Sequence, residues 1–410
     1  MAISPKENFT VGIKDFWARK IRSFITILGI ILGTMSIIVV MSLVQSINKM
    51  TMDFMLQRGG LKKITINRNY EYQKKKDVKQ YFTFNEFNKI KNLIPNLEYI
   101  SATIRSYGKT SSKQKEYWGP VFGVLPSFKF TEEWDAEKGR FISDFDEDES
   151  NSVIVLGKNV SDELFGKKNP IGKIVSYHGK RLKVIGIMKY RYFKNSQNIG
   201  NNNDNQLDYL NRRCYVPLST MIHKINAKDK ISNFSLIVND INNVESTKKY
   251  IENLLLNIRQ GENVFSIQSS QDTINQSKNG LKIFSLIFGL ISAISLLVGG
   301  IVIMNIMLAT VQERTREIGV RLAIGARGLD IFFQFLIQTV LTTLIGGFIG
   351  VGISFSLLSF IGGFLNMPLK PSFPMVIVSL LVSGSVGLIF GIGPAVKASR
   401  LNPVTALRYE

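Results

Sequence analysis

The sequence is nearly devoid of residues that build disulfides, metal sites and nucleophilic active sites. Its one cysteine, Cys214, excludes an intrachain disulfide. Its two histidines, His178 and His223, have no second metal ligand close by in the sequence, which argues against a metal site. The segment Gly-x-x-x-x-Gly-Lys-Ser/Thr is missing, so the chain does not cradle nucleotide phosphates as P-loop proteins do. We therefore expect no catalytic residue, no metal and no cofactor in this chain, and we do not expect it to be an enzyme.

Charged residues are missing from three long stretches. Phe24–Val44 and Ile283–Leu308 carry none, and none occurs between Asp330 and Lys370. About 20 apolar residues cross the hydrocarbon core of a bilayer, so each of the first two stretches predicts one transmembrane helix. The third stretch is too long for a single span, and we expect it to hold most of two.

Glycine and proline divide that third stretch. Gly362, Gly363, Asn366 and Pro368 predict a short turn region near its end. A third span then falls near Ile331–Leu358 and a fourth near Met375–Ala395. Pro374 and Pro394 predict the start and the end of the fourth span, as helix punctuation.

The expected fold class is a membrane α-helical protein with four transmembrane helices and one large extracytoplasmic α+β domain. By residue number, we expect a cytoplasmic amphipathic helix (1–22), a first span (23–46), the extracytoplasmic domain (47–281), a second span (282–309), a cytoplasmic loop (310–329), a third span (330–358), a short external loop (359–373), a fourth span (374–395) and a cytoplasmic tail (396–410).

The orientation follows from the basic residues that flank the spans. These lie before the first span, between the second and third, and after the fourth: Lys14, Arg19, Lys20, Arg22, Arg314, Arg316, Arg321, Arg327, Lys397, Arg400 and Arg408. The loop between the third and fourth spans has only Lys370. Because short basic loops stay in the cytoplasm, both termini are predicted inside and residues 47–281 outside.

Before the first span, apolar residues gather near one face of a predicted helix. They are Phe9, Ile13, Phe16, Trp17 and Ile21. This pattern predicts an amphipathic helix on the cytoplasmic membrane surface, because tryptophan favours the interface. The alternative is a cytoplasmic extension of the first span.

The large insert alternates strand-like and helix-like runs. The strand-like runs are Lys63–Asn67, Val153–Leu156, Leu182–Ile187, Phe234–Val238 and Val264–Ile267. The helix-like runs are Asn85–Leu93, Asp162–Phe165 and Val244–Ile258. Such alternation predicts an α+β or α/β domain with its own core.

The insert carries 37 Lys and Arg against 25 Asp and Glu, a surplus of 12 within the net charge of +20. This surplus serves solubility, or attracts anionic lipid or an acidic partner. The lysines are scattered and not interleaved with aromatics, so we expect no nucleic-acid binding. The acidic run Asp144–Glu149 lacks the spacing of a calcium loop and predicts a solvated turn. The Asn-rich run Asn195–Asn205 predicts a mobile loop, with a partner contact as the alternative.

The loop Thr310–Arg327 reads Thr-Val-Gln-Glu-Arg-Thr-Arg-Glu-Ile-Gly-Val-Arg-Leu-Ala-Ile-Gly-Ala-Arg. This is a short helix tied to two spans. Arg316, Arg321 and Arg327 could bind carboxylates of a docking protein in a bidentate manner. Gly325 and Ala326 permit a tight turn before the next span. The alternative is a membrane-surface loop whose arginines meet lipid headgroups.

This loop resembles the signature of MacB/FtsX-type permeases, and the resemblance extends along most of the chain. The further matching segments are Arg22, Thr26, Leu28–Ile30, Gly139–Phe141, Val155–Gly157, Leu164–Gly166, Pro170–Lys173, Val184–Gly186, Val216–Ser219, Gln334–Ile337 and Pro394–Arg408. In this order they are specific to the family, although each short motif of the insert is weak alone.

The resemblance implies a four-span permease that dimerises with a second copy or a homologous permease and binds two copies of an ABC ATPase. ATP and Mg would be bound by that ATPase. The chain begins only about twenty residues before its first span, so the ATPase is expected as a separate polypeptide, unlike in MacB. The insert would resemble the MacB periplasmic core, with a porter-like α/β part and a smaller inserted part. The implied location is the bacterial cytoplasmic (inner) membrane.

In that family the loop couples ATP-driven closure to movement of the outside domains. The residues that match the coupling element are Glu313, Arg314, Thr315, Arg316, Glu317, Ile318, Gly319, Arg321, Gly325, Ala326 and Arg327. The implied function is efflux or export of a periplasmic or outer-leaflet substrate, often through an adaptor and an outer-membrane channel. The alternatives are lipoprotein release, or FtsX-like signalling to a cell-wall hydrolase or sensor kinase without transport. The large insert favours transport or lipoprotein release.

Two polar residues lie inside the predicted spans. Asn305 and Gln338 would be costly against lipid, so helix–helix hydrogen bonding is the expected role, with substrate contact as the alternative. The family usually has Glu at the position of Gln338. Gly346, Gly347 and Gly350 allow close helix packing, at or beside a dimer interface, or else flexibility.

Overall fold

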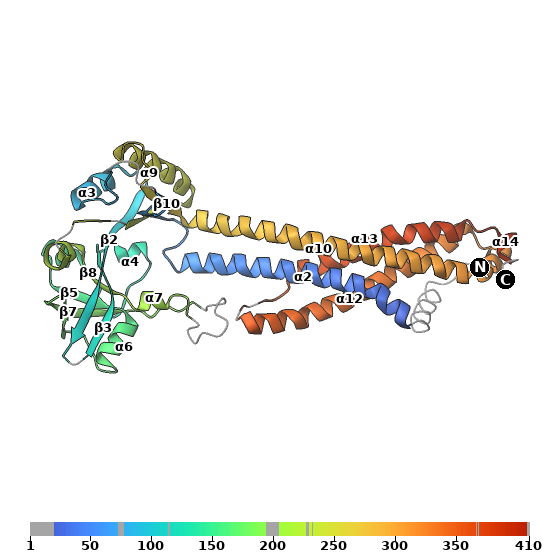
Figure 1. Ribbon diagram of the computed structural model, residues 1–410, viewed down its shortest axis with the longest axis horizontal. Helices are drawn as coiled ribbons and strands as arrows, with labels where there is room; N and C mark the ends of the chain where they lie inside the picture. The colour runs from blue at the N-terminus through green and yellow to red at the C-terminus, as the bar shows by residue number, and fades with distance from the viewer. Residues whose placement is uncertain are drawn as a thin grey trace. The chain divides into compact units, whose positions relative to one another are not determined.

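The computed structural model describes residues 20–72, 78–113, 115–193, 205–226, 229–231, 233–365, 367 and 369–407, with side chains from Ile27 onward. The chain folds into two units (Figure 1). The helical unit contains Met1–Asn48 and Asn279–Glu410, and the α/β unit contains Lys49–Lys278. The predicted amphipathic helix before the first span lies almost entirely outside the described residues, as does most of Asn195–Asn205.

The first part of the α/β unit is a pair of interleaved βαβ motifs. One consists of β1 (Lys63–Arg68), α3 (Phe84–Leu93) and β2 (Leu97–Ser112), the other of β9 (Asn233–Val238), α9 (Val244–Ile258) and β10 (Phe265–Ser269). The sheet order is β10-β1-β9-β2, with antiparallel neighbours. Each motif thus leaves room for one strand of the other, and both helices lie on one face of the sheet, where Phe87 and Ile251 join the same core.

The second part is inserted between β2 and β9 and closes into a barrel. β2 pairs with β3 (Lys115–Val124), and the ring continues through β8 (Cys214–Pro217), β5 (Val153–Leu156), β7 (Lys180–Met188) and β6 (Ile174–Tyr177) back to β2. A short strand, β4 (Ala136–Gly139), pairs with β7 outside the ring. Closure leaves no free edge among these six strands. The predicted porter-like part and smaller inserted part are therefore both present.

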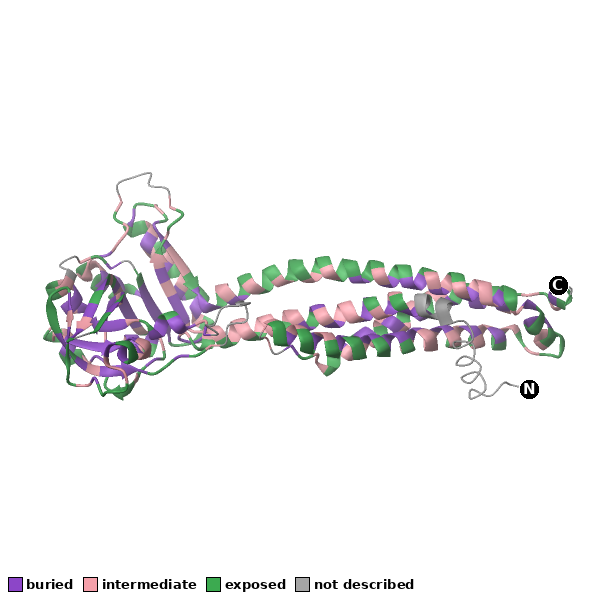
Figure 2. Cartoon of the chain, turned by 60° about the horizontal axis from the view of Figure 1, so that its bottom comes forward, coloured by how far each residue is buried: buried purple, intermediate pink, exposed green. Residues whose placement is uncertain are grey.

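Two apolar cores stabilise this unit, and Figure 2 colours its buried residues purple. The larger core runs from the βαβ motifs into the barrel, where α6 (Lys158–Phe165) contributes Val160 and Leu164. The smaller core lies outside the barrel, beneath α4 (Phe128–Thr131) and α7 (Asp208–Asn211), and centres on Tyr215. The remaining short helices are α5 (Asp144–Asp148), α8 (Leu218–Thr220), the π-helix η1 (Met221–Asn226) and the 3₁₀ helix η2 (Ile241–Asn243).

The elements predicted from apolar periodicity are confirmed, whereas β2, β3, β4, β6 and β8 were not predicted. The helix Val244–Ile258 has the predicted bounds, because Val244, Ile251 and Leu255 form one buried face. The long hairpin of β2 and β3 was not predicted. Its buried positions include Ser101 and Thr110, so the alternation of apolar and polar residues is weak there.

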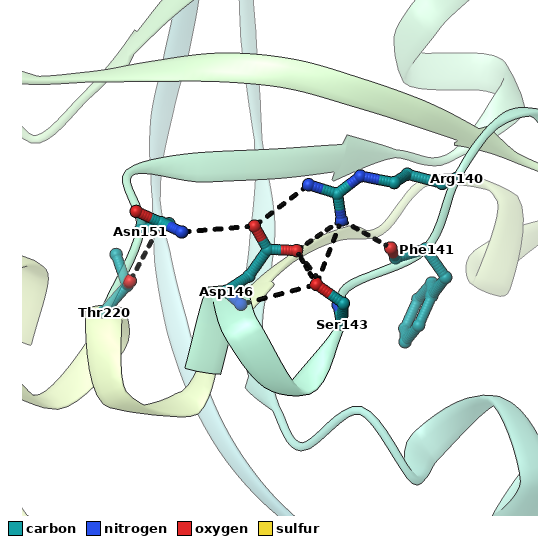
Figure 3. A network of polar contacts seen from close by, with 6 residues as sticks. All are labelled: Arg140, Phe141, Ser143, Asp146, Asn151 and Thr220. Carbon is teal, nitrogen blue, oxygen red and sulfur yellow. Dashed lines mark hydrogen bonds and ion pairs between the residues drawn. The ribbon is translucent and has the colours of Figure 1, made fainter. Parts of the chain in front are cut away.

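The prediction of a solvated turn at Asp144–Glu149 is wrong. Ser143 caps α5 in a reciprocal capping box with Asp146. The Asp146 side chain is buried and ion-paired with Arg140, and Asn151 donates to it from the other side (Figure 3). The high charge of this segment suggested that it is exposed to solvent. In the structure, one of its carboxylates instead forms the capping box and an ion pair inside the protein.

The part of the chain that the structure describes contains four helices that are long and apolar enough to cross a membrane, and most of each lies in the helical unit. They are α2 (Lys20–Leu56), α10 (Ser270–Glu313), α12 (Gly328–Leu365) and α13 (Phe373–Ser399). Two shorter helices, α11 (Thr315–Ala323) and α14 (Pro403–Leu407), follow α10 and α13. The four-span prediction and the fold class are thus confirmed, although α2 and α10 run well beyond the predicted spans.

Two predictions about helix ends are wrong. Gly362 and Gly363 are helical residues of α12, while Asn366 and Pro368 lie outside the described residues. Pro394 lies inside α13, which continues to Ser399. Membrane helices tolerate glycine and proline inside their length, because neighbouring groups satisfy the freed backbone atoms.

Candidate functional site

The predicted coupling segment forms α11, which is joined to α10 by a one-residue interruption at Arg314. Backbone hydrogen bonds continue across this interruption, from Arg314 N to Thr310 O and from Ile318 N to Arg314 O. The Thr315 hydroxyl donates to Val311 O and Gln312 O, a local bond that often bends a helix. The two helices are therefore joined by continuous backbone hydrogen bonds, with no flexible linker between them.

The inner face of α11 packs on the long helices. Thr315, Ile318 and Gly319 are buried, and Ile318 belongs to the main core of the helical unit. The same core contains residues of α10, α12 and α13, among them Val311, Phe335, Ala395 and Ala398. A displacement of α11 would therefore disturb the packing of three spans at once.

Polar contacts fix α11 against α12. Arg321 donates to Gln334 Oε1 over 2.9 Å, and its other amino group donates to Glu317 Oε1 over 2.5 Å. Arg314 lies 4.0 Å from the same carboxylate group. The structure thus assigns Arg321 partners within the chain, although the sequence predicted it to bind a docking protein. Arg316 and Arg327 remain exposed.

The outer face of α11 is partly apolar. Val320 is 45% exposed and Ile324 is 81% exposed. The helix ends at Ala323, and Gly325 follows two residues later with a φ of +104° that favours glycine. Ala326 N donates back to Arg321 O. Gly325 and Ala326 thus form the tight turn predicted from the sequence. Arg327 N donates to Asp330 Oδ2 at the start of α12.

The structure adds one element that the coupling prediction did not include. Gly319 faces Ala406 of α14, and a methyl group at Gly319 would lie 2.6 Å from the Ala406 Cβ. Asn402 and Pro403 begin α14, where Asn402 Oδ1 accepts from Val404 N. This start signal was readable in the sequence, but nothing in it indicated that α14 would contact α11.

Asn305 and Gln338 were each expected to form hydrogen bonds between helices. Asn305 is exposed on α10 and Gln338 is half-buried on α12. Within the described part of the chain, neither side chain forms a hydrogen bond to another helix. Helix–helix bonds are made instead by hydroxyls that the prediction missed, from Ser292 to Ser36 over 2.7 Å and from Ser383 to Thr343 O over 2.8 Å.

The three α12 glycines that the sequence marked for close packing have neighbours within the chain. A methyl group at Gly346 would lie 3.0 Å from Ile27, and one at Gly350 would lie 2.1 Å from Thr34 Oγ1, both on α2. A methyl group at Gly347 would lie 3.0 Å from Ser383 Oγ of α13. These faces of α12 are therefore occupied by the chain's own helices.

Fold and site together define a membrane protein of four apolar helices, an α/β unit and a short helix docked across the spans. Residues 23–254 match the family described as MacB-like periplasmic core domain, and residues 289–403 match the FtsX-like permease C-terminal family. The chain therefore belongs to the MacB/FtsX-like ABC transporter permeases, as the resemblance predicted.

Individual relatives agree with this assignment. The chain is 31% identical over 407 residues to the uncharacterized ABC transporter permease YknZ of Bacillus subtilis, covering 98% of this chain and 99% of that one. It is also 31% identical over 423 residues to the macrolide export ATP-binding/permease protein MacB of Bdellovibrio bacteriovorus, covering 98% of this chain but 62% of that one.

Solved structures similar to the chain include the periplasmic region of MacB from Actinobacillus actinomycetemcomitans. That match has a TM-score of 0.46 at 21% identity and covers 55% of this chain and 96% of the other. The extracellular domain of YknZ from Gram-positive bacteria matches with a TM-score of 0.41 at 19% identity, covering 50% of this chain and all of that domain.

Proposed function

We propose that this chain is the permease subunit of an ABC transporter that couples ATP hydrolysis by a separate ATPase to movement of the α/β unit, and so drives efflux or export. The observation that carries the proposal is the construction of α11. Its inner face is fixed by Ile318 and by the Arg321–Gln334 hydrogen bond, while Arg316 and Ile324 remain exposed on its outer side. A docked protein that moves such a helix would also move the spans on which the helix packs.

The connectivity of the chain defines how a movement of α11 is transmitted. α11 continues α10 across the hydrogen-bonded interruption at Arg314, and α10 begins at Ser270, directly after strand β10. A movement of α11 is therefore carried by continuous helix to an edge strand of the α/β sheet. In this mechanism the chain contributes packing and rigidity, and no chemical step falls on it. ATP and Mg would be bound by the partner ATPase.

The proposed assembly holds two ATPase copies and two permeases, either identical or homologous. It lies in the bacterial cytoplasmic membrane, with both termini in the cytoplasm and the α/β unit outside. Relatives named for macrolide export and for pyoverdine export support export as the activity. The proposed substrate is taken from the periplasm or from the outer leaflet of that membrane. A periplasmic adaptor and an outer-membrane channel would complete the route in a cell with an outer membrane.

The test is purification of the tagged full chain from its native membranes in mild detergent, with the ATPase-to-permease ratio measured by mass spectrometry. An ABC ATPase, identified by peptides that contain its P-loop, is expected with the wild type and should be lost with Arg316→Glu. Arg181→Glu makes the same charge change at an exposed site of the α/β unit and should retain the ATPase.

If no ATPase accompanies the wild type while other membrane complexes remain intact, the proposal fails. An adaptor in the wild-type sample would support export. A cell-wall hydrolase or a sensor kinase in its place would contradict export and favour signalling.

A further inference from the structure

The two short helices at the cytoplasmic ends of α10 and α13 are packed together. Ala406 is 2% exposed and sits against Gly319, where a methyl group would find Ala406 Cβ at 2.6 Å and the Ala406 carbonyl carbon at 3.4 Å. Only glycine permits this approach with Ala406 in place. Leu401, just before α14, packs on the core that also contains Ile318. α14 is therefore seated on α11 and on the spans.

Outside this contact, both helices carry exposed apolar side chains. On α14, Val404 is 63% exposed and Leu407 is 43% exposed, and on the neighbouring α11 Val320 and Ile324 are exposed as well. Apolar side chains grouped on neighbouring elements mark an interaction surface, whereas isolated ones do not. These four lie beyond the apolar runs of the spans, so the hydrocarbon core of the membrane does not account for them.

The same segments of the chain carry four exposed basic residues, here called the basic rim. Arg316, Arg327, Lys397 and Arg400 are exposed, and in the part of the chain that the structure describes none of them forms an ion pair. An apolar centre with a charged rim is the usual anatomy of a protein interface, and a basic rim selects an acidic partner surface.

We propose that α14 and α11 form one docking surface for the ATPase, so that the C-terminal helix is a second contact beside the coupling helix. The inference rests on the proposed function. Three observations favour the ATPase as occupant: continuity with α11, the basic rim, and the ATP-binding part of the fused MacB relatives. This chain spans only 62% of the Bdellovibrio relative, whose name includes both an ATP-binding and a permease part. A membrane surface is the other candidate occupant, which the test separates.

The test places the photo-cross-linking residue p-benzoylphenylalanine at single positions of the full chain in its native membranes. The positions are Val404 on α14, Ile324 on α11 and, as a control, Leu93, which is 52% exposed on α3 of the α/β unit. Replacing exposed side chains leaves the core intact. A cross-linked protein counts as the ATPase only if its peptides include a P-loop.

We expect the same ATPase to cross-link at Val404 and at Ile324, and not at Leu93. Cross-linking at Ile324 alone would overturn the role of α14 and leave the proposed function standing. Cross-linking at neither position, with the protein present at its normal level, would contradict both. The two failures are therefore distinguishable.

Moving one methyl group from Ala406 to Gly319 tests whether the packing of α14 on α11 is needed for ATPase binding. Gly319→Ala places its methyl group against Ala406, and α14 must shift. Ala406→Gly combined with Gly319→Ala removes the clashing atom and leaves the Ala406 carbonyl carbon and Cα at 3.4 and 3.5 Å from the new methyl group. We expect the single variant to lower the ATPase-to-permease ratio by about tenfold, as for loss of a well-packed interface contact, and the exchange to restore it. An unchanged ratio in Gly319→Ala, or no recovery in the exchange, would contradict the proposal.

Discussion

Arg321 of α11 donates a hydrogen bond to Gln334 Oε1 of α12 over 2.9 Å, while Glu317 binds its other amino group. One arginine thus ties the short helix to the third span. Arg316, one and a half turns away on the same helix, is exposed instead. The two arginines are accordingly expected to have different roles, rigidity for Arg321 and docking for Arg316.

Gln334→Leu removes the acceptor and keeps the approximate size of the side chain. A hydrogen bond to a charged group contributes about 1.5–3 kcal/mol, so α11 should be less firmly held. We expect the ATPase-to-permease ratio to stay within about twofold of wild type, whereas Arg316→Glu should lower it about tenfold, as expected for a contact at the interface. Gln334→Glu keeps an acceptor and serves as control. If Gln334→Leu loses the ATPase as Arg316→Glu does, the division of roles is wrong.

The substitution Asp146→Asn tests how much the buried Asp146 carboxylate contributes to the stability of the fold around α5. Burial alone would raise the pKa of Asp146, but hydrogen bonds from Arg140 and Ser143 outweigh burial and lower its pKa from 3.8 to about 2. The stability it adds is present above pH 3.8 and is lost as the pH falls through about 2. We expect the variant to lower the free energy of unfolding by about 2 kcal/mol at pH 7, through loss of bonds to a charged acceptor. Unfolding followed by tryptophan fluorescence measures this, with exposed Asp148→Asn as control.

The pKa of Glu147 is shifted in the opposite direction to that of Asp146. Burial raises its pKa from 4.5 to about 7, against hydrogen bonds from Ser219 and Leu218. The unfolded chain releases this proton more readily, so the stabilising contribution is present below pH 4.5 and is lost as the pH rises through about 7. Glu147→Gln should therefore gain stability relative to wild type between pH 5 and 8. Parallel thermal melts at both pH values, with Glu149→Gln as control, check this expectation. A constant difference between variant and wild type would refute it.

Gly350→Ala tests the packing of α12 on α2. The new methyl group would lie 2.1 Å from Thr34 Oγ1, which itself donates to Ile30 O over 2.8 Å. Overpacking of this kind costs roughly 1–3 kcal/mol, so a lower melting temperature in detergent is expected. Gly352→Ala, two residues away with nothing within 4 Å, should melt like wild type. Equal melting of both variants would place Gly350 outside the helix contact.

Much of this architecture could be predicted from the sequence, where the physical signal is local. Uncharged runs predicted the spans, and apolar periodicity predicted Val244–Ile258 with the observed bounds. Contacts between distant segments could not be predicted. The partner of Arg321 depends on how α12 packs, and the contact of Gly319 with Ala406 joins residues 87 positions apart. Pro394 and the glycine pair at 362 and 363 misled the prediction because rules for helix ends come largely from soluble helices.

We propose that ATP binding to a docked ATPase moves the α/β unit. Cys214 is fully buried, and burial raises its pKa to about 12, so a thiol-directed spin label will react with an introduced cysteine instead. Lys249→Cys on the exposed side of α9 supplies one label for each copy in the assembled complex.

The decisive measurement is the distance distribution between these two labels by pulsed electron paramagnetic resonance, with and without ATP under conditions that block hydrolysis. We predict a shift with ATP in the wild-type background and none in Arg316→Glu. An unchanged distribution in a complex that binds ATP normally would show that ATP binding does not move the α/β unit.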